Sequence, residues 1–280
     1  INRMNKATGE FSYITSANSI TSNNIKSLIT DAGHNLWIST FMGGLDLYNV
    51  GRQKVTNFKH TKGAPHSLLV NDVRKTILEG DSGMWVAYQY QKAEVSYFSF
   101  REESFTHFSL DSISNNSYLF DILRQGEKTL WAISNETLYR LDIDKHVVEK
   151  MIPNDSTYLG LFTFCLDDSG NIWFSTNKGI SCYIAVKNSF YNYGRWDGVP
   201  IVGFMSGSVT HDYDGNIYFG SLNGLCRFNP EMVLAKREAP SAIMTGLRIF
   251  VPISERKSEE KMIELHGCPA VRLSYMQNNF

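Results

Sequence analysis

The segment Asp167-Asp-Ser-Gly-Asn171-Ile-Trp173-Phe-Ser-Thr176 decides the fold, because versions of it recur along the chain. Its first half is rich in Asp, Gly and Asn, which tolerate the positive φ of tight turns, and its second half is a short apolar strand. The second half recurs at four other places, Asn35–Thr40, Gly83–Tyr88, Thr129–Ser134 and Asn216–Ser221. The aromatic residues at their centres are 48, 46, 42 and 45 residues apart, so the chain is built from repeats.

Each repeat contains signals for four strands. A short apolar stretch comes before the turn, and a third strand such as Gly44–Tyr48 or Gly179–Tyr183 follows the aromatic phrase. Ten residues after the third strand, an aromatic residue marks a fourth strand; these residues are Phe58, Phe108 and Tyr193. Four antiparallel strands in about 45 residues are typical of a β-propeller blade. The sequence therefore predicts an all-β fold, with a propeller of five visible four-stranded blades over residues 1–229.

The recurring tryptophan has two interpretations. An exposed indole could serve as a stacking platform for a sugar, but a large aromatic at one register of every repeat is what packing between blades requires. We therefore expect these rings to form the core.

The count of strands leaves the ring open. The fifth repeat ends at Phe228 and runs into Asn229-Pro230 without a fourth strand, whereas Glu10–Ile14 resembles a lone fourth strand near the start. Either that strand closes a five-bladed ring, or it ends a further blade. An open ring leaves two unpaired edges, which favours closure. The absence of an initiating Met favours a segment of a larger ring, which is the interpretation that we prefer.

The periodicity stops after Asn229. Residues 230–240 read as a linker, and 241–280 as the start of a β-sandwich with strands at Ala242–Ile249 and Ala270–Tyr275. Between them, the charged stretch Ser254–Lys261 reads as a solvated loop. Two or three strands cannot bury a core alone, so this second domain is incomplete in the chain.

Composition excludes several classes of protein. The 280 residues carry 27 Lys plus Arg against 28 Asp plus Glu, a net charge of −1, so a basic nucleic-acid-binding protein is not expected. No apolar run is long enough to cross a bilayer. The four cysteines lack metal-ligand spacing, and Cys165 and Cys182 lie on the first and third strands of one blade, too far apart for a disulfide.

The repeats resemble a known family. An apolar strand, Asp-x-x-Gly-Asn-x-Trp-Ile/Phe-Ser-Thr and then Gly-Leu/Ile-x-x-Tyr is similar to the two-component regulator propeller repeat. The tail segments Pro240–Ile249 and Leu273–Phe280 resemble the opening strands of the tyrosine-rich β-sandwich that follows such propellers. The repeat headed by Trp85 departs from the pattern, with Ala93-Glu94 in place of the usual Gly.

The resemblance implies the extracytoplasmic sensor region of a hybrid two-component histidine kinase. It implies a periplasmic location, an oligosaccharide ligand, a homodimer in the full sensor, and a membrane segment and kinase domain downstream of this chain. Propellers of this kind are usually seven-bladed, so the resemblance also implies two blades upstream.

Ligand contacts are expected on the face where second strands lead to third strands and fourth strands lead to the next blade, because these connections vary in length. The predicted ligand-binding residues combine aromatic, amide and charged groups, which suit a sugar. They are Tyr88, Gln89, Tyr90, Asn135, Glu136, Asn177, Lys178, Arg195, Trp196 and Asp197. The alternative for Trp196 is a cap on its blade or a contact with another domain.

No motif for catalysis, a cofactor or a metal is present in the sequence. Asp212–Asn216 superficially resembles a calcium loop, but Asn223 stands where a calcium-binding helix-loop-helix site needs Glu, and a turn accounts for the segment. Streptogramin lyases have similar Gly-Asn-Ile-Trp-Phe repeats, so a propeller enzyme with His and an acid near the axis is one alternative. A non-catalytic interaction or dimerisation scaffold is another.

Overall fold

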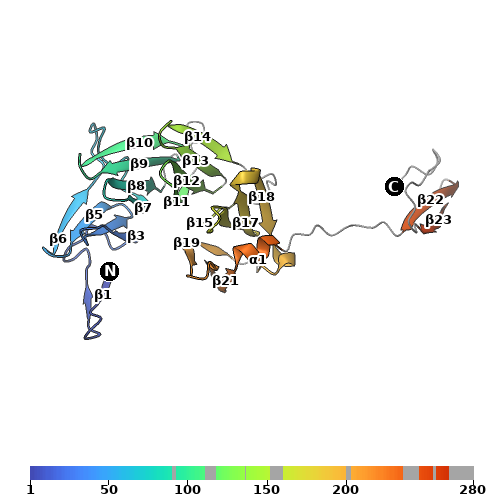
Figure 1. Cartoon of the computed structure of the whole chain (residues 1–280), viewed down its shortest axis with the longest axis horizontal. Coiled ribbons are helices and arrows are strands. Elements are labelled where there is room, and N and C mark those ends of the chain that lie inside the picture. The colour runs from blue at the N-terminus through green and yellow to red at the C-terminus, as the bar shows by residue number, and fades with distance from the viewer. Residues whose placement is uncertain are drawn as a thin grey trace. The chain divides into compact units, whose positions relative to one another are not determined.

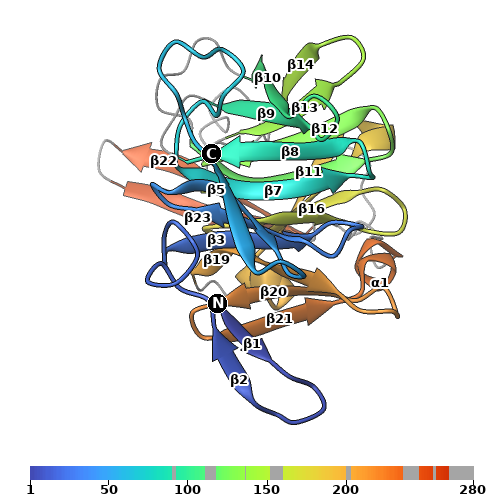
Figure 2. The ribbon, with the colours of Figure 1, turned by 90° about the vertical axis from the view of Figure 1, so that its left-hand side faces the viewer.

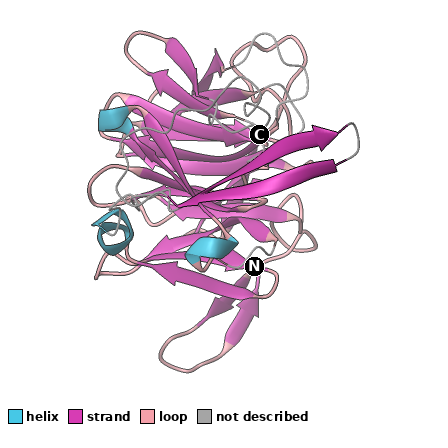
Figure 3. Ribbon diagram, turned by 90° about the vertical axis from the view of Figure 1, so that its right-hand side faces the viewer, coloured by secondary structure: helices cyan, strands magenta, loops and turns pink. Residues whose placement is uncertain are grey.

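The fold was analysed in a computed structural model, which describes residues 1–89, 93–110, 118–135, 137–151, 160–199, 203–235, 246–254 and 257–264. Strands dominate the chain (Figure 3), and the five predicted blades are present. The chain forms two compact units, Ile1–Glu231 and Met232–Phe280. The first unit contains the blades.

Four blades are four-stranded antiparallel sheets in simple up-and-down order. Their strands are β3 (Ile25–Thr30), β4 (Leu36–Thr40), β5 (Gly44–Asn49) and β6 (Lys54–Phe58); β7 (Val73–Glu79), β8 (Gly83–Tyr88), β9 (Glu94–Ser99) and β10 (Ser104–Ser109); β11 (Leu119–Gln125), β12 (Thr129–Ser134), β13 (Leu138–Asp142) and β14 (Val147–Met151); β15 (Phe164–Leu166), β16 (Ile172–Thr176), β17 (Gly179–Ile184) and β18 (Ser189–Tyr193). The fifth blade has three strands, β19 (Phe204–His211), β20 (Ile217–Ser221) and β21 (Gly224–Phe228). The sheets follow one another in chain order, and the first strands of successive blades are neighbours (Figure 1).

Each of the first four blades packs on the next through its central tryptophan. Trp37 contacts Phe98 and Phe100 of the second blade, with ring centroids 5.7 and 5.5 Å apart, and Trp173 lies 4.8 Å from Phe228 of the fifth blade. Trp85 lies in a buried cluster with residues of β11–β13, and Trp131 in one with residues of β16 and β17. The packing interpretation of the repeated tryptophan is confirmed.

The indole nitrogens show how the turns support this packing. Trp173 Nε1 donates to Asp167 Oδ2 at 2.8 Å, and Trp131 Nε1 donates to Gln125 Oε1 at 2.8 Å. The equivalent acceptors of the other blades also lie six residues before the aromatic residue; they are Asp31, Glu79 and Asp212. In the first, fourth and fifth blades the same Asp side chain also accepts from the backbone N–H four residues further on, so it holds both the turn and the ring.

The start of the chain corrects one expectation. Residues Phe11–Tyr13 form a strand, β2, but its partner is β1 (Asn2–Met4), so the segment is half of a hairpin and not a lone fourth strand of the fifth blade. Figure 2 shows the hairpin projecting from the blades. In the hairpin Met4 lies opposite Phe11, and in the first blade Tyr48 lies opposite Val55. Both residues of the second pair are 44 positions further along the chain, so the two hairpins have the same register. The hairpin therefore has the pattern of the two outer strands of a blade.

The second unit also departs from the sequence prediction. Its described strands are β22 (Gly246–Ser254) and β23 (Lys257–Glu264), which pair antiparallel. Most of the charged stretch Ser254–Lys261, which was expected to be a loop, is a strand. Pairing with β22 satisfies its backbone N–H and C=O groups. The first part of the expected linker is helix α1 (Pro230–Ala235), and the strand expected at 270–275 lies outside the described residues.

Candidate functional site

The loop face is the name used here for the side of the propeller where second strands lead to third strands and fourth strands lead to the next blade. The turn face is the opposite side, where turns join first strands to second strands and third strands to fourth strands. The sequence places its ten predicted ligand-binding residues on the loop face. Tyr90 and Glu136 lie outside the described residues.

Tyr88 is not in a loop. It is the last residue of β8 and is buried, because its ring belongs to the core between the first two blades. Its hydroxyl donates to Ser96 Oγ at 2.7 Å, and Ser96 Oγ also lies 2.7 Å from His107 Nδ1. Burial raises the pKa of Tyr88 well above its usual value. Tyr88 is therefore a core residue beneath the loop face and does not line it.

Gln89 and Asn135 occupy the same position in successive blades, one residue after the second strand. Their side-chain oxygens, Oε1 and Oδ1, are buried and accept no hydrogen bond from any of the described residues. A buried acceptor without a donor costs about 1–3 kcal/mol. These two atoms are therefore suited to accept hydrogen bonds from a ligand that reaches them.

The remaining predicted residues are exposed. Asn177 lies beside Gly160, whose backbone N–H donates to Asn135 O at 2.8 Å, so the candidates of the third and fourth blades come together there. Lys178 follows it in the chain. The other three form the short 3-10 helix η2 (Arg195–Asp197) between β18 and β19, where the Trp196 side chain is 99% exposed. Within the part of the chain that the structure describes, no interaction joins η2 to Gln89 or Asn135.

Sequence analysis missed a second group of residues, at the axial ends of the first strands. The register against the second strand shifts by one residue between Ile25 and Ser27, and equivalent shifts occur in β7 and β11. A β-bulge redirects the side chain of its extra residue. The extra residues are Lys26, Arg74 and Phe120, and Phe162 is equivalent to them just before β15.

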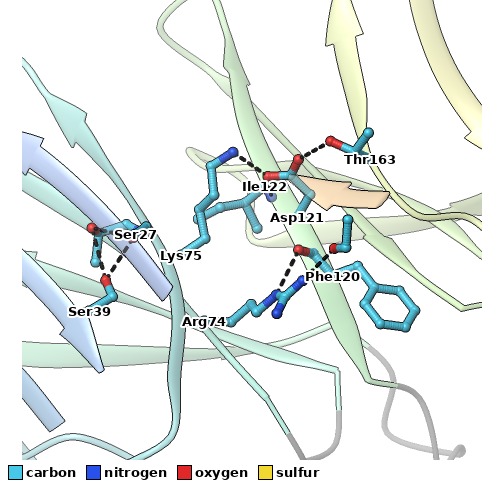
Figure 4. Close-up of polar contacts among 10 residues, drawn as sticks. Ser27, Ser39, Arg74, Lys75, Phe120, Asp121, Ile122 and Thr163 are labelled. Carbon is cyan, nitrogen blue, oxygen red and sulfur yellow. Dashed lines mark hydrogen bonds and ion pairs between the residues drawn. The ribbon is translucent and has the colours of Figure 1, made fainter. Parts of the chain in front are cut away.

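A buried ion pair lies next to the bulges (Figure 4). Lys75 Nζ is 2.6 Å from Asp121 Oδ1, and the Asp121 side chain is 1% exposed. Thr163 Oγ1 donates to Asp121 Oδ2 at 2.8 Å, and the Ile122 backbone N–H donates to Oδ1 at 2.9 Å. These contacts join the second, third and fourth blades and neutralise the carboxylate.

Arg74 reaches across blades from its bulge. Its Nε donates to Phe120 O at 3.3 Å in the third blade, and its Nη2 donates to Ser206 Oγ in the fifth blade (Figure 4). Between the first two blades, Ser39 Oγ lies 2.9 Å from Ser27 Oγ and 3.2 Å from Thr76 Oγ1. The axis is therefore lined by polar contacts between blades.

The bulge of the third blade and the equivalent position of the fourth blade carry aromatic rings instead. The centroids of Phe120 and Phe162 are 6.4 Å apart, with planes inclined at 43°. Both side chains are partly exposed. The axial end of the loop face thus combines cationic and aromatic residues from equivalent positions. Their signal in the sequence is the presence of basic residues, Lys26 and Arg74, at the start of first strands, where a regular apolar strand would not place them.

Comparison with known proteins agrees with this architecture. No protein-family model matches the chain. Among curated proteins, Histidine kinase P4 of Formosa agariphila is 20% identical in an alignment 262 residues long, which covers 88% of this chain and 18% of the relative. The chain therefore spans about a fifth of the length of the curated relative that it matches.

Solved structures show the same fold. The extracellular domain of a putative hybrid two-component system from B. thetaiotaomicron is 25% identical with a TM-score of 0.60, over 93% of this chain and 40% of that one. The extracellular domain of a putative one-component system from the same organism is 14% identical with a TM-score of 0.66, over 89% of this chain and 33% of that one. A streptogramin B lyase is 10% identical with a TM-score of 0.63, over 81% of this chain and 70% of that one.

The resemblance to the extracytoplasmic regions of two-component systems, indicated by the repeats, is confirmed by these similarities. They are consistent with an extracytoplasmic location. Within the described residues, none of the helices is long and apolar enough to span a membrane.

Proposed function

We propose that the chain is part of the extracytoplasmic, ligand-sensing region of a two-component sensor, and that its loop face recognises a carbohydrate. The similarity to extracellular domains of two-component systems supports the sensor role. The buried acceptor oxygens of Gln89 and Asn135 carry the proposal for a sugar, since a hydroxyl group is the donor that they lack.

The residues at the first-strand bulges would complete a site for a sugar. The partly exposed rings of Phe120 and Phe162 can stack on the apolar C–H face of a pyranose, and Arg74 can donate to its oxygens. The ligand would act by binding one conformation of the sensor better than another across a homodimer, with the signal passing through the β-sandwich to a membrane-linked kinase. The kinase chemistry would lie outside these 280 residues.

A lyase-like activity has less support. The proposed enzyme needs a histidine near the axis, and none stands at the axial ends of the first strands in the part of the chain that the structure describes. Asp121, the acid found there, is already occupied by Lys75 and Thr163. A pure scaffold remains the other alternative, and ligand binding distinguishes it from a sensor.

The test is thermal unfolding of the purified protein in the presence of oligosaccharides of different linkage and charge. A ligand at 100 times its Kd that binds only the folded state stabilises it by about 2.7 kcal/mol. We expect one glycan class to raise Tm and the double variant Gln89→Ala/Asn135→Ala to reduce that rise. Absence of a shift with every glycan would contradict carbohydrate sensing and favour the scaffold.

A further inference from the structure

A long connection joins the first two blades. Residues 59–72 run from the end of β6 to the start of β7, and this segment is called the blade connection here. It is closed on itself, since the His60 N–H donates to Asn71 Oδ1 at 2.7 Å. It also contacts the outer strand of the second blade, where the Phe105 N–H donates to His66 O at 3.0 Å. The blade connection is therefore an ordered segment that packs on β10.

The side chain of His107, on β10, joins the blade connection to the second blade. Its Nε2 lies 3.0 Å from Pro65 O, and a carbonyl oxygen only accepts, so Nε2 carries a hydrogen and donates. Its Nδ1 lies 2.7 Å from Ser96 Oγ. In a neutral imidazole with its hydrogen on Nε2, Nδ1 accepts from the Ser96 hydroxyl. The two contacts therefore select one neutral tautomer of His107.

The hydrogens around Ser96 are balanced only when His107 is neutral. The Tyr88 hydroxyl donates to Ser96 Oγ at 2.7 Å, so the contacts of Ser96 with Tyr88 and with His107 hold one hydrogen each. Both Tyr88 and Ser96 are buried. A proton on Nδ1 would place three hydrogens in two contacts and leave one buried donor without an acceptor in this run, which is unfavourable.

Other blades have a side chain that does not titrate at the position of His107. In the first blade Asn57 Nδ2 donates to Asp46 Oδ1 at 2.6 Å, and in the fourth blade Ser181 Oγ donates to Asn192 Oδ1 at 2.7 Å. Each of these pairs joins the third and fourth strands in the register of Ser96 and His107. The second blade thus replaces an amide with the side chain that changes charge between pH 5 and 8.

The surroundings of His107 oppose its protonation. Burial lowers the pKa of His107 below its usual value, and His66 of the blade connection acts in the same direction. Glu94 of β9 and the carbonyl groups of the blade connection act against this lowering. On the side of β8 the ring faces Ser96 and then Tyr88, whose own pKa is raised by burial.

A cavity of about 540 Å³ gives the ring a way out. It is bounded by His107 and by residues of the blade connection, including His60 and Leu68, and it is open to solvent. A ring that turns into this space becomes hydrated and leaves both Ser96 and Pro65. Since the hydrated ring takes up a proton more readily than the packed ring, acid shifts the equilibrium towards the open arrangement.

The blade connection ends at residues that support the loop face. The Gly44 N–H donates to Asn71 O at 2.9 Å, and the Gln89 N–H donates to Asp72 O at 3.0 Å. Gln89 also follows Tyr88 directly in the chain. A change in the blade connection therefore reaches the backbone of a candidate ligand-binding residue.

We propose that His107 is a pH-sensitive latch on the blade connection. The neutral imidazole fastens the connection to the second blade at Pro65, and protonation frees the ring from Ser96 and loosens the connection. An effect of the latch on a ligand held by Gln89 rests on the proposed carbohydrate sensing, whereas the latch itself does not.

The test is hydrogen exchange of the purified protein, measured by mass spectrometry and divided by the rate expected for an unfolded chain at the same pH. The latch has a lowered pKa when closed, so its stabilisation is complete above the unfolded-state value of about 6.5 and is lost as pH falls through the folded-state value. Peptides covering residues 59–72 should therefore lose protection between about pH 7.5 and about pH 5. Peptides covering β16 and β17 should keep theirs.

Two variants separate His107 from other titrating groups. His107→Asn introduces the residue that the first and fourth blades carry, so protection of the blade connection should no longer fall with pH. His211→Asn, at the exposed end of β19, should keep the pH dependence of the wild type. Thermal unfolding at neutral pH checks that both variants are folded, and His107→Gln takes the place of His107→Asn if the latter is not.

Loss of protection that is confined to the blade connection, and absent from His107→Asn, supports the latch. An equal loss in His107→Asn overturns it and assigns the response to another group, such as His60 or His66 of the connection. Protection that stays constant in the wild type, or falls equally in β16 and β17, also overturns it. No ligand enters these measurements, so failure of the latch leaves carbohydrate sensing intact, and the glycan screen decides that proposal separately.

Discussion

The turn face and the loop face of the propeller differ in how far they repeat. On the turn face, every blade places an acceptor six residues before its central aromatic residue, as Asp167 does for Trp173. On the loop face, equivalent positions hold different chemistry, as Arg74 and Phe120 do at two bulges. Repetition therefore marks the residues that build the blades, and its loss marks the residues available for recognition.

Among the tests of this comparison, removal of a central tryptophan should have the largest effect on stability. Trp173→Ala should destabilise the protein by about 3–5 kcal/mol, because a buried aromatic is lost between the fourth and fifth blades. Trp196→Ala, which removes the same side chain from an exposed site, should change stability by less than about 0.5 kcal/mol. Urea unfolding of both variants measures the difference. Equal effects would show that the ring does not hold the blades together.

Breaking the ion pair between Lys75 and Asp121 should have the second-largest effect on stability. Lys75→Met leaves the buried Asp121 carboxylate without its cation and should cost about 3 kcal/mol, the low end for a broken buried pair because Lys75 is partly exposed. The double variant Lys75→Met/Asp121→Leu should recover part of the loss. If the single variant unfolds at the wild-type urea concentration, the pair does not stabilise the junction of the blades.

The turn acceptor should have a smaller effect. Asp167→Ala removes the acceptor of Trp173 Nε1 and of the Asn171 amide, and should cost about 1–3 kcal/mol. Asp168→Ala changes the neighbouring exposed carboxylate of the same turn and should be nearly neutral. Denaturant unfolding that shows no difference between these neighbours would contradict the role given to the acceptor.

The smallest effect concerns pH. Hydrogen bonds from Tyr218 and then Asn216 lower the pKa of Asp212 to about 2. Because the folded-state pKa is depressed, its stabilisation is present above the unfolded-state value of about 3.9 and is lost as pH falls towards 2. The difference in Tm between wild type and Asp212→Asn should therefore shrink from pH 5 to pH 2. A difference that stays constant over this range would contradict the assignment.

The repeat period predicted the blades correctly, but it did not predict the elements that depart from the repeat. The strand at Phe11–Tyr13 was located, but its partner was missed, because the outer hairpin of a blade lacks the tryptophan phrase that marks the inner strands. Charge misled the interpretation of Lys257–Glu264, since a strand at the edge of a small sheet tolerates charged residues that a core strand does not. Tyr88 was expected in a loop although it also ends the apolar phrase Gly83–Tyr88, and the structure shows it as the last residue of β8.

The sequence by itself determined the strand order, the blade period and the packing of the tryptophans, because these depend on local patterns that recur every 42–48 residues. Only the tertiary structure brought Arg74, Phe120 and Ser206 together, since they come from three blades and are separated by up to 132 residues. The bulges that direct the first two of them to the axis are breaks in register, and a register exists only once the partner strand is in place. The blades are thus encoded locally, whereas the proposed recognition site arises where they meet.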